Sequence, residues 1–174
     1  MKQFWRSCAS CIAWLAVSEL LCLVLAFSFA ILRPAWIRYL SLLCCAAAHL
    51  LLMWQCGEKT ALRDAAGFRL TGRRVPRKKA LLTAAVAALT MEIPFLFLCM
   101  FPGSSAVLNV FLLLNAPYIQ FYRIILDGLE PFSALPLHSQ IWLALPPSLS
   151  ACVLYIGTEW NYEKKIVAIR QQRA

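Results

Sequence analysis

The chain has 174 residues, of which 61% are hydrophobic and only 14% are charged, and its formal net charge is +9. A soluble domain carries charge on about a quarter of its residues, and here the mean hydropathy is +0.69, so the composition excludes an ordinary soluble enzyme and indicates a single integral membrane domain, 1–174. Because the positive charge lies beside apolar runs, where basic residues fix topology and meet anionic lipid, nucleic acid is not an expected partner.

Two apolar runs open the chain. The first covers residues 11–32, which is long enough to span a bilayer as a helix and long for the apolar part of a signal peptide, so an uncleaved span is expected. Arg33-Pro34 ends it, because the residue before a proline avoids the helical region. The second run covers residues 36–54. The short link between the runs predicts an antiparallel helical hairpin.

A basic segment follows and is predicted to be a cytoplasmic loop over 57–79. It contains eight of the seventeen Lys and Arg residues of the chain. Residues 59–68 are compatible with a short surface helix or with a solvated linker. Six basic residues near its end are expected to contact anionic lipid head groups or a partner protein: Arg69, Arg73, Arg74, Arg77, Lys78 and Lys79.

Three further apolar runs complete an all-α, polytopic transmembrane bundle of about five segments. The third run covers 80–101 and the fourth covers 106–126, which is less purely apolar. The last run, 135–156, is divided by Pro146-Pro147, so it is either a kinked span or a re-entrant segment. Residues 158–174 form a polar C-terminal tail.

Charge counting sets the expected orientation. With the basic loop in the cytoplasm, five spans place the N-terminus there too, and eleven basic residues then lie inside against six outside. A re-entrant last run would return the C-terminus to the cytoplasm and change the balance to fifteen against two. The length of the last run favours a span, so five spans are predicted.

Four polar side chains fall at similar depth within the apolar runs, namely Glu19, His49, Glu92 and Asn115. Ionisable residues inside a span are rare and usually mark a pathway or a partner. Together they predict an intramembrane site for a cation, a proton or a cationic small molecule. Glu92 is the leading candidate, because Pro94 frees a backbone carbonyl close to it. The alternative is that Glu92 is protonated and only joins neighbouring helices.

Cys8-Ala9-Ser10-Cys11 forms a C-x-x-C pattern at the start of the first run. In the five-span arrangement Cys56 and His138 lie at the same face, and three cysteines with one histidine would complete a tetrahedral zinc shell. The same pattern is compatible with a redox pair or with ordinary interfacial cysteines. No other cofactor is predicted.

Three functions remain open from the sequence: a small transport-type protein, a non-catalytic membrane subunit that binds partner proteins, and a membrane thiol-redox or zinc protein. The chain shows none of the common motifs of soluble enzymes, so enzymatic activity is not expected. Few helices are present to enclose a pathway, which favours a homo-oligomer or a larger membrane complex for the first hypothesis.

Overall fold

The computed structural model describes residues 2–31, 36–75, 77–126 and 137–172, together with Pro34, Phe132 and Leu135. These residues form helices and connecting turns, with no strand among them. The elements are α1 (Lys2–Ala30), α2 (Trp36–Thr71), α3 (Arg77–Met100), α4 (Ser105–Leu113), the short 3₁₀ helix η1 (Ala116–Tyr118), α5 (Ile119–Ile125) and α6 (Leu137–Gln171).

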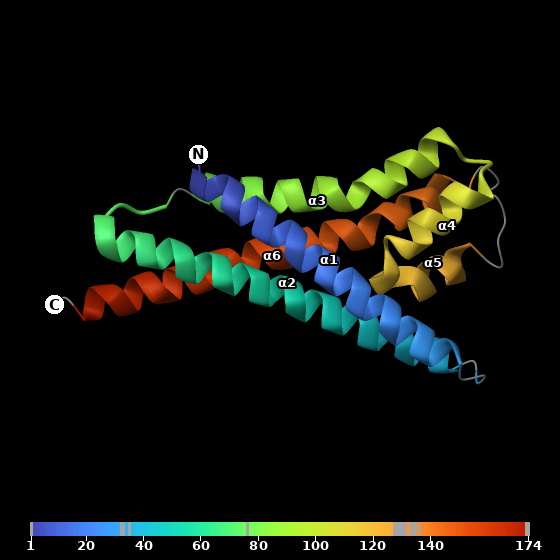
Figure 1. Ribbon diagram of the computed structural model, residues 1–174, viewed down its shortest axis with the longest axis horizontal. Helices are drawn as coiled ribbons and strands as arrows, with labels where there is room; N and C mark the ends of the chain where they lie inside the picture. Colours follow the sequence, from blue (N-terminus) through green and yellow to red (C-terminus); the bar gives the residue numbers. More distant parts are fainter. Residues whose placement is uncertain are drawn as a thin grey trace.

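Four helices, α1, α2, α3 and α6, are each long and apolar enough to cross a membrane. In the most apolar window of α1 only 22% of the residues are buried within the protein. Most of the apolar side chains of this helix therefore face outward, as lipid-facing residues do. The long helices lie alongside one another in a bundle (Figure 1), which confirms the predicted all-α, multi-pass architecture.

The two ends of the bundle differ in charge. The start of α1, the α2–α3 connector and the end of α6 lie at one end, which we call the basic end (Figure 1). The other end, the far end, holds the α1–α2 link and the α3–α4 turn. Of the fifteen Lys and Arg residues in the described part of the chain, thirteen lie toward the basic end and only Arg38 and Arg123 lie at the far end.

The fourth apolar run is the broken one. α4 and the helix that follows it are bent by 95° at residues 114–115. The pair begins next to the end of α3, and Arg123 of α5 lines a cavity with Ala30 and Arg38, so both of its ends lie at the far end (Figure 1). The fourth run therefore enters and leaves the bundle at the same end, as a re-entrant segment does, and the end of α6 lies at the basic end.

The last run is a candidate span, as its length predicted, and its two prolines do not break it. α6 is one continuous helix through Pro146 and Pro147. Each proline removes a single backbone donor, and the packing of α6 against α2 and α3 keeps the rod continuous. The end of α6 lies on the other side from the one that the five-span arrangement predicted, because the fourth run, and not the last, begins and ends at the far end.

The predicted loop over 57–79 is also mostly helical, because α2 continues to Thr71 and α3 begins at Arg77. Buried small residues recur every four positions along this part of α2, at Gly57, Ala61 and Ala65. They give the helix a narrow face that packs on α6, which likewise continues through the predicted polar tail to Gln171. The shared core of this extension consists of Ala61, Ala65, Phe68, Tyr162 and Ile166.

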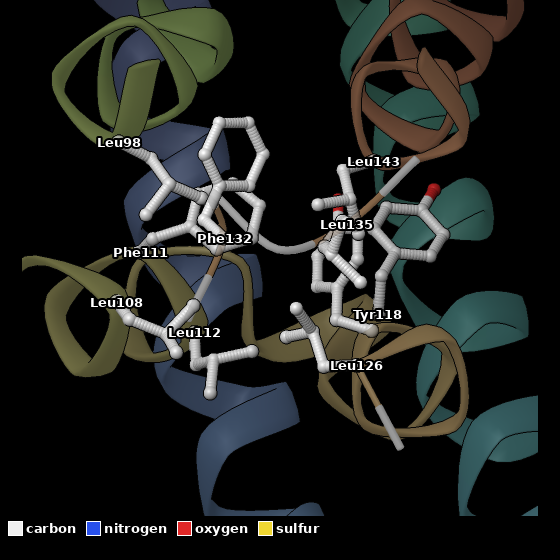
Figure 2. Close-up of a cluster of buried hydrophobic side chains, with 10 residues drawn as sticks. Leu98, Leu108, Phe111, Leu112, Tyr118, Leu126, Phe132, Leu135 and Leu143 are labelled. Carbon is white, nitrogen blue, oxygen red and sulfur yellow. The ribbon is translucent and has the colours of Figure 1, made fainter. Parts of the chain in front are cut away.

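α1 and α2 form the predicted antiparallel hairpin with one constant register. The Cys11 and Cys56 sulfurs are 3.3 Å apart. Seven residues further along α1, Ser18 faces His49, and four residues beyond that Cys22 faces Cys45. At the far end, side chains from α3, α4, α5 and α6 make a separate core around the re-entrant pair (Figure 2).

Candidate intramembrane polar site

A chain of hydrogen bonds crosses the middle of the bundle. His49 of α2 is fully buried, and its Nδ1 lies 2.6 Å from Ser18 Oγ of α1. Its Nε2 lies 2.9 Å from Ser150 Oγ of α6. Tyr118 OH of η1 lies 2.9 Å from the same Ser150 oxygen. Four elements that are distant in sequence therefore meet through polar contacts at one level of the bundle.

One assignment of protons satisfies every member of this chain. Ser150 has a single proton, and its hydroxyl donates to the Pro146 carbonyl at 3.1 Å. Ser150 must then accept from both Tyr118 O–H and His49 Nε2–H, since a hydroxyl oxygen has two lone pairs. The imidazole is neutral in this arrangement, and its Nδ1 accepts from Ser18. A rotation of the Ser150 hydroxyl would reverse the direction of donation.

Glu19 reaches the break in the re-entrant pair. Its Oε2 accepts a hydrogen bond of 3.0 Å from the backbone N–H of Ala116, the first residue of η1. That N–H is available because the first donors of any helix have no partner within it. The carboxyl group is half-buried and lies against the same short helix that carries Tyr118.

Asn115 and Tyr122 leave buried polar atoms unused beside this break. The Asn115 amide nitrogen donates to the Phe111 carbonyl at 2.9 Å, which orients the side chain. Its Oδ1 is buried and has no hydrogen-bond partner among the described residues, and the same holds for the hydroxyl of Tyr122. A buried acceptor without a partner is costly, so these atoms suit a bound ion or water.

The structure brings Glu19, His49 and Asn115 together around η1, but it places Glu92 differently. Glu92 of α3 is half-buried and interacts with Ser148 of α6. Ser148 is exposed, whereas Ser150 is buried and carries the hydrogen bonds of the central chain. Three of the four predicted residues therefore lie around η1, whereas Glu92 lies toward Ser148 and is still close enough to Tyr122 for an electrostatic interaction.

The predicted zinc set is wrong. Cys11 pairs with Cys56 across α1 and α2, whereas Cys8 is buried toward Thr83 of α3. His138 stands at the start of α6, at the far end. Gly57 packs against Leu154 and Thr158, so Cys56 lies roughly 25 Å along the α6 axis from His138. In the described chain no group of three or more potential metal ligands occurs.

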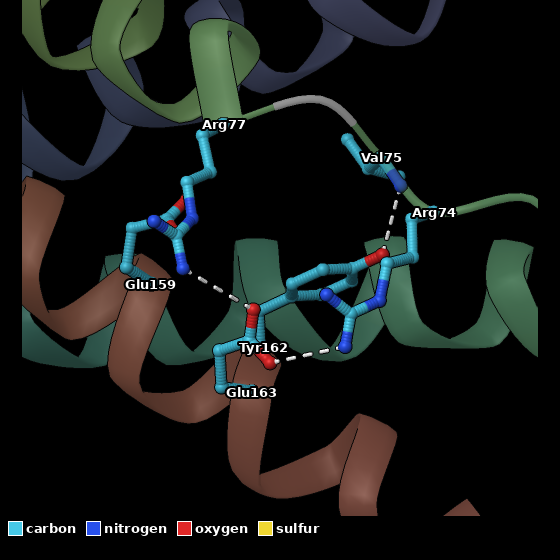
Figure 3. A network of polar contacts seen from close by, with 6 residues as sticks. All are labelled: Arg74, Val75, Arg77, Glu159, Tyr162 and Glu163. Atoms are coloured by element: carbon cyan, nitrogen blue, oxygen red, sulfur yellow. Dashed lines mark hydrogen bonds and ion pairs between the residues drawn. The ribbon is translucent and has the colours of Figure 1, made fainter. Parts of the chain in front are cut away.

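Several of the basic residues predicted to face lipid are engaged within the protein (Figure 3). Arg77 pairs with Glu159 at 3.4 Å, and Arg74 pairs with Glu163 at 3.5 Å. Lys79 and Asp64 form a largely buried ion pair. The backbone N–H of Val75 donates to Tyr162 OH at 2.8 Å, which ties the α2–α3 connector to α6. Arg73 and Lys78 are exposed, and Arg69 also makes an interaction.

Sequence reasoning missed Ser18, Tyr118 and Ser150, because single serines and tyrosines are ordinary in apolar helices. The sequence did contain one indication of the Ser18 contact. If Cys11 lies opposite Cys56 in an antiparallel hairpin, then Ser18, seven residues later, lies opposite His49, seven residues earlier. The far-end pair Arg38 and Arg123 was also missed, since it depends on the re-entrant path of α5.

No protein family, curated protein or solved structure matches this chain. Its function is therefore inferred from the site alone.

Proposed function

We propose that this chain is a transport-type membrane protein whose central polar site binds a proton or a small cation. The observation that carries the proposal is the contact of the Glu19 carboxylate with the Ala116 N–H at the break of the re-entrant pair. Discontinuous helices that place their ends inside a bundle are a recurrent way to build ion and substrate sites in transporters.

The groups around the break suit positive charge. The Glu19 carboxylate and the unused Asn115 Oδ1 are oxygen acceptors from two elements, α1 and the α4–η1 junction. The neighbouring chain from Ser18 through His49 to Ser150 and Tyr118 provides groups that both donate and accept protons. Such a chain favours proton movement because each member exchanges roles by rotating a hydroxyl or changing tautomer.

The proposed orientation places the basic end in the cytoplasm. Thirteen of the fifteen described Lys and Arg residues lie toward that end, as the preference of basic residues for the cytoplasmic side requires. The exposed side chains of Arg73 and Lys78 are then positioned to meet anionic lipid head groups.

Flux measurements in liposomes test the proposal. Purified protein is reconstituted with a pH-sensitive dye inside, and a potassium diffusion potential drives protons inward. Wild-type protein should acidify the lumen faster than protein-free liposomes do. Glu19→Gln keeps the shape of the side chain but removes its charge, so we expect it to reduce flux to the protein-free rate.

Two matched variants give the comparison. Glu163→Gln removes a carboxylate at the basic end, away from the site, and should leave the flux unchanged. Glu92→Gln should have a smaller effect than Glu19→Gln, because Glu92 faces Ser148. Proton and cation fluxes at the protein-free rate for wild type would contradict transport and favour the non-catalytic subunit. Loss of flux in Glu92→Gln, with normal flux in Glu19→Gln, would show that Glu92 and not Glu19 is the essential carboxylate.

A further inference from the structure

A polar cavity lies at the far end, away from the central polar site. It has a volume of about 310 Å³ and is lined by the ends of α1, α2 and α5. Arg38 and Ser41 enter it from α2, and Gln120 and Arg123 enter it from α5. Each pair is three residues apart, so both members of each pair lie on one face of their helix.

Ser41 is the most informative residue of this cavity. It is fully buried, and its hydroxyl has no hydrogen-bond partner among the described residues. The Cys45 thiol lies one turn further along α2, close to the hydroxyl but outside hydrogen-bond geometry. A buried hydroxyl without a partner is destabilising by about 1–3 kcal/mol. A ligand with acceptor oxygens in the cavity would satisfy it.

The positive charge of the cavity favours an anionic ligand. Neither Arg38 nor Arg123 forms an ion pair with a carboxylate in the described part of the chain. Two guanidinium groups with an amide and a hydroxyl are the donor set that phosphate oxygens accept from, and arginine binds phosphate through two parallel hydrogen bonds.

An apolar groove continues from the cavity. It has a volume of about 50 Å³ and shares Ala30, Gln120 and Arg123 with it. Its other walls come from Leu23, Ala26, Phe27 and Ile119. A ligand that fills both spaces must have an anionic head and an apolar tail.

We propose that Arg38, Ser41, Gln120 and Arg123 form a binding site for the phosphate head of an anionic lipid, whose acyl chain enters the groove beside Phe27 and Ile119. The site lies at the far end of the bundle, so the lipid belongs to the leaflet opposite the basic end. This site is independent of the central polar site and of the proposed transport function.

Native mass spectrometry of the detergent-solubilised protein tests this site with phosphatidic acid as the probe. The measurement is made at about 0.5 M salt, where the Debye length is about 4 Å and diffuse attraction at exposed basic residues is screened. Wild-type protein should retain one phosphatidic acid molecule. Arg38→Gln with Arg123→Gln should weaken retention by at least about tenfold, the effect of losing charge-assisted hydrogen bonds.

The matched control is Arg73→Gln with Lys78→Gln, which removes two exposed charges at the basic end and should change retention less than about twofold at this salt concentration. Ser41→Val fills the cavity without altering charge and should also weaken retention. Both double variants must keep the wild-type melting temperature in lipid-free detergent. If the first double variant unfolds, the retention of phosphatidic acid by Ser41→Val alone tests the proposal.

Three outcomes would overturn the proposal. The first is equal retention of phosphatidic acid by wild type and by the far-end variants. The second is equal retention of phosphatidylcholine, whose head group carries no net charge. The third is displacement of phosphatidic acid by an equal concentration of inorganic phosphate, which would show that the cavity takes a free anion and that the groove contributes nothing.

Discussion

Gly57 marks a close approach of two helices, α2 and α6. A Cβ atom at Gly57 would lie 2.8 Å from the backbone nitrogen of Thr158 and 2.9 Å from the carbonyl oxygen of Leu154. Both atoms belong to the α6 backbone, which cannot move aside as a flexible side chain can. Gly157 stands opposite, against Trp54. Small residues of this kind permit close packing between membrane helices, where apolar burial provides little driving force.

We therefore expect Gly57→Ala to destabilise the protein by about 1–3 kcal/mol, the usual cost of overpacking. Gly67→Ala is the matched control, because a Cβ there meets nothing within 4 Å. It should be neutral or stabilising by up to about 1 kcal/mol through better helix propensity. Thermal unfolding in one detergent compares the two variants. Equal melting temperatures would contradict the close crossing.

At the scale of single residues, the sequence indicated which polar side chains lie inside the apolar runs, but it did not indicate their hydrogen-bond partners. Glu19, His49 and Asn115 were recognisable, because polar groups in apolar runs are rare. The partners of these residues were not, because Ala116 contributes a backbone N–H and Ser150 is one serine among many. The position of Glu92 beside Ser148 was also not predictable, since its depth and its neighbour Pro94 do not indicate which face of α3 it occupies.

Among the elements, α2 and α6 differ most from the expectation. The basic composition of residues 57–79 predicted a loop, yet α2 continues to Thr71. The spacing of Gly57, Ala61 and Ala65 was visible in the sequence, but its meaning depended on a matching partner in α6. A high content of charged residues indicates that a segment is exposed to solvent. It does not distinguish a loop from a helix that extends beyond the membrane.

The Asp64–Lys79 pair is expected to fix the start of α3 on this extension. Asp64→Asn leaves the largely buried Lys79 ammonium without its counter-charge, which should destabilise the protein by about 3 kcal/mol. Arg74→Gln breaks an exposed pair with Glu163 and should cost less than about 1 kcal/mol. Chemical or thermal unfolding in detergent measures both. A larger loss from Arg74→Gln than from Asp64→Asn would contradict this ranking.

For the whole molecule, the re-entrant pair decides the topology. The four long helices place the start of α1, the α2–α3 connector and the end of α6 at one end of the bundle, whereas the α3–α4 turn lies at the other. Hydropathy alone counted five segments, because a helix that enters and returns contains as many apolar residues as one that crosses. The meeting of α5 with the ends of α1 and α2, and the contact of Tyr162 with Val75 at the basic end, separate the two cases.

Reporter fusions test this arrangement. A reporter active only in the cytoplasm should work when it is joined to either terminus or inserted at Arg73. A reporter active only outside should work when it is inserted at Gly103, in the exposed α3–α4 turn. Opposite signals from the two termini would mean that the fourth run crosses the membrane and that the five-span arrangement is correct.

The length of α2 has a structural consequence. Its 36 residues span about 54 Å, while the apolar core of a bilayer is about 30 Å thick. α2 is therefore longer than the apolar core is thick, and its excess length forms, with the end of α6 that packs on it, a paired stalk at the basic end. Both prolines of α6 lie beyond Ser150 when it is followed from the stalk. No proline therefore interrupts α2 or α6 between the Gly57 crossing and the level of His49 and Ser150, so both helices are continuous from the stalk to the central polar site.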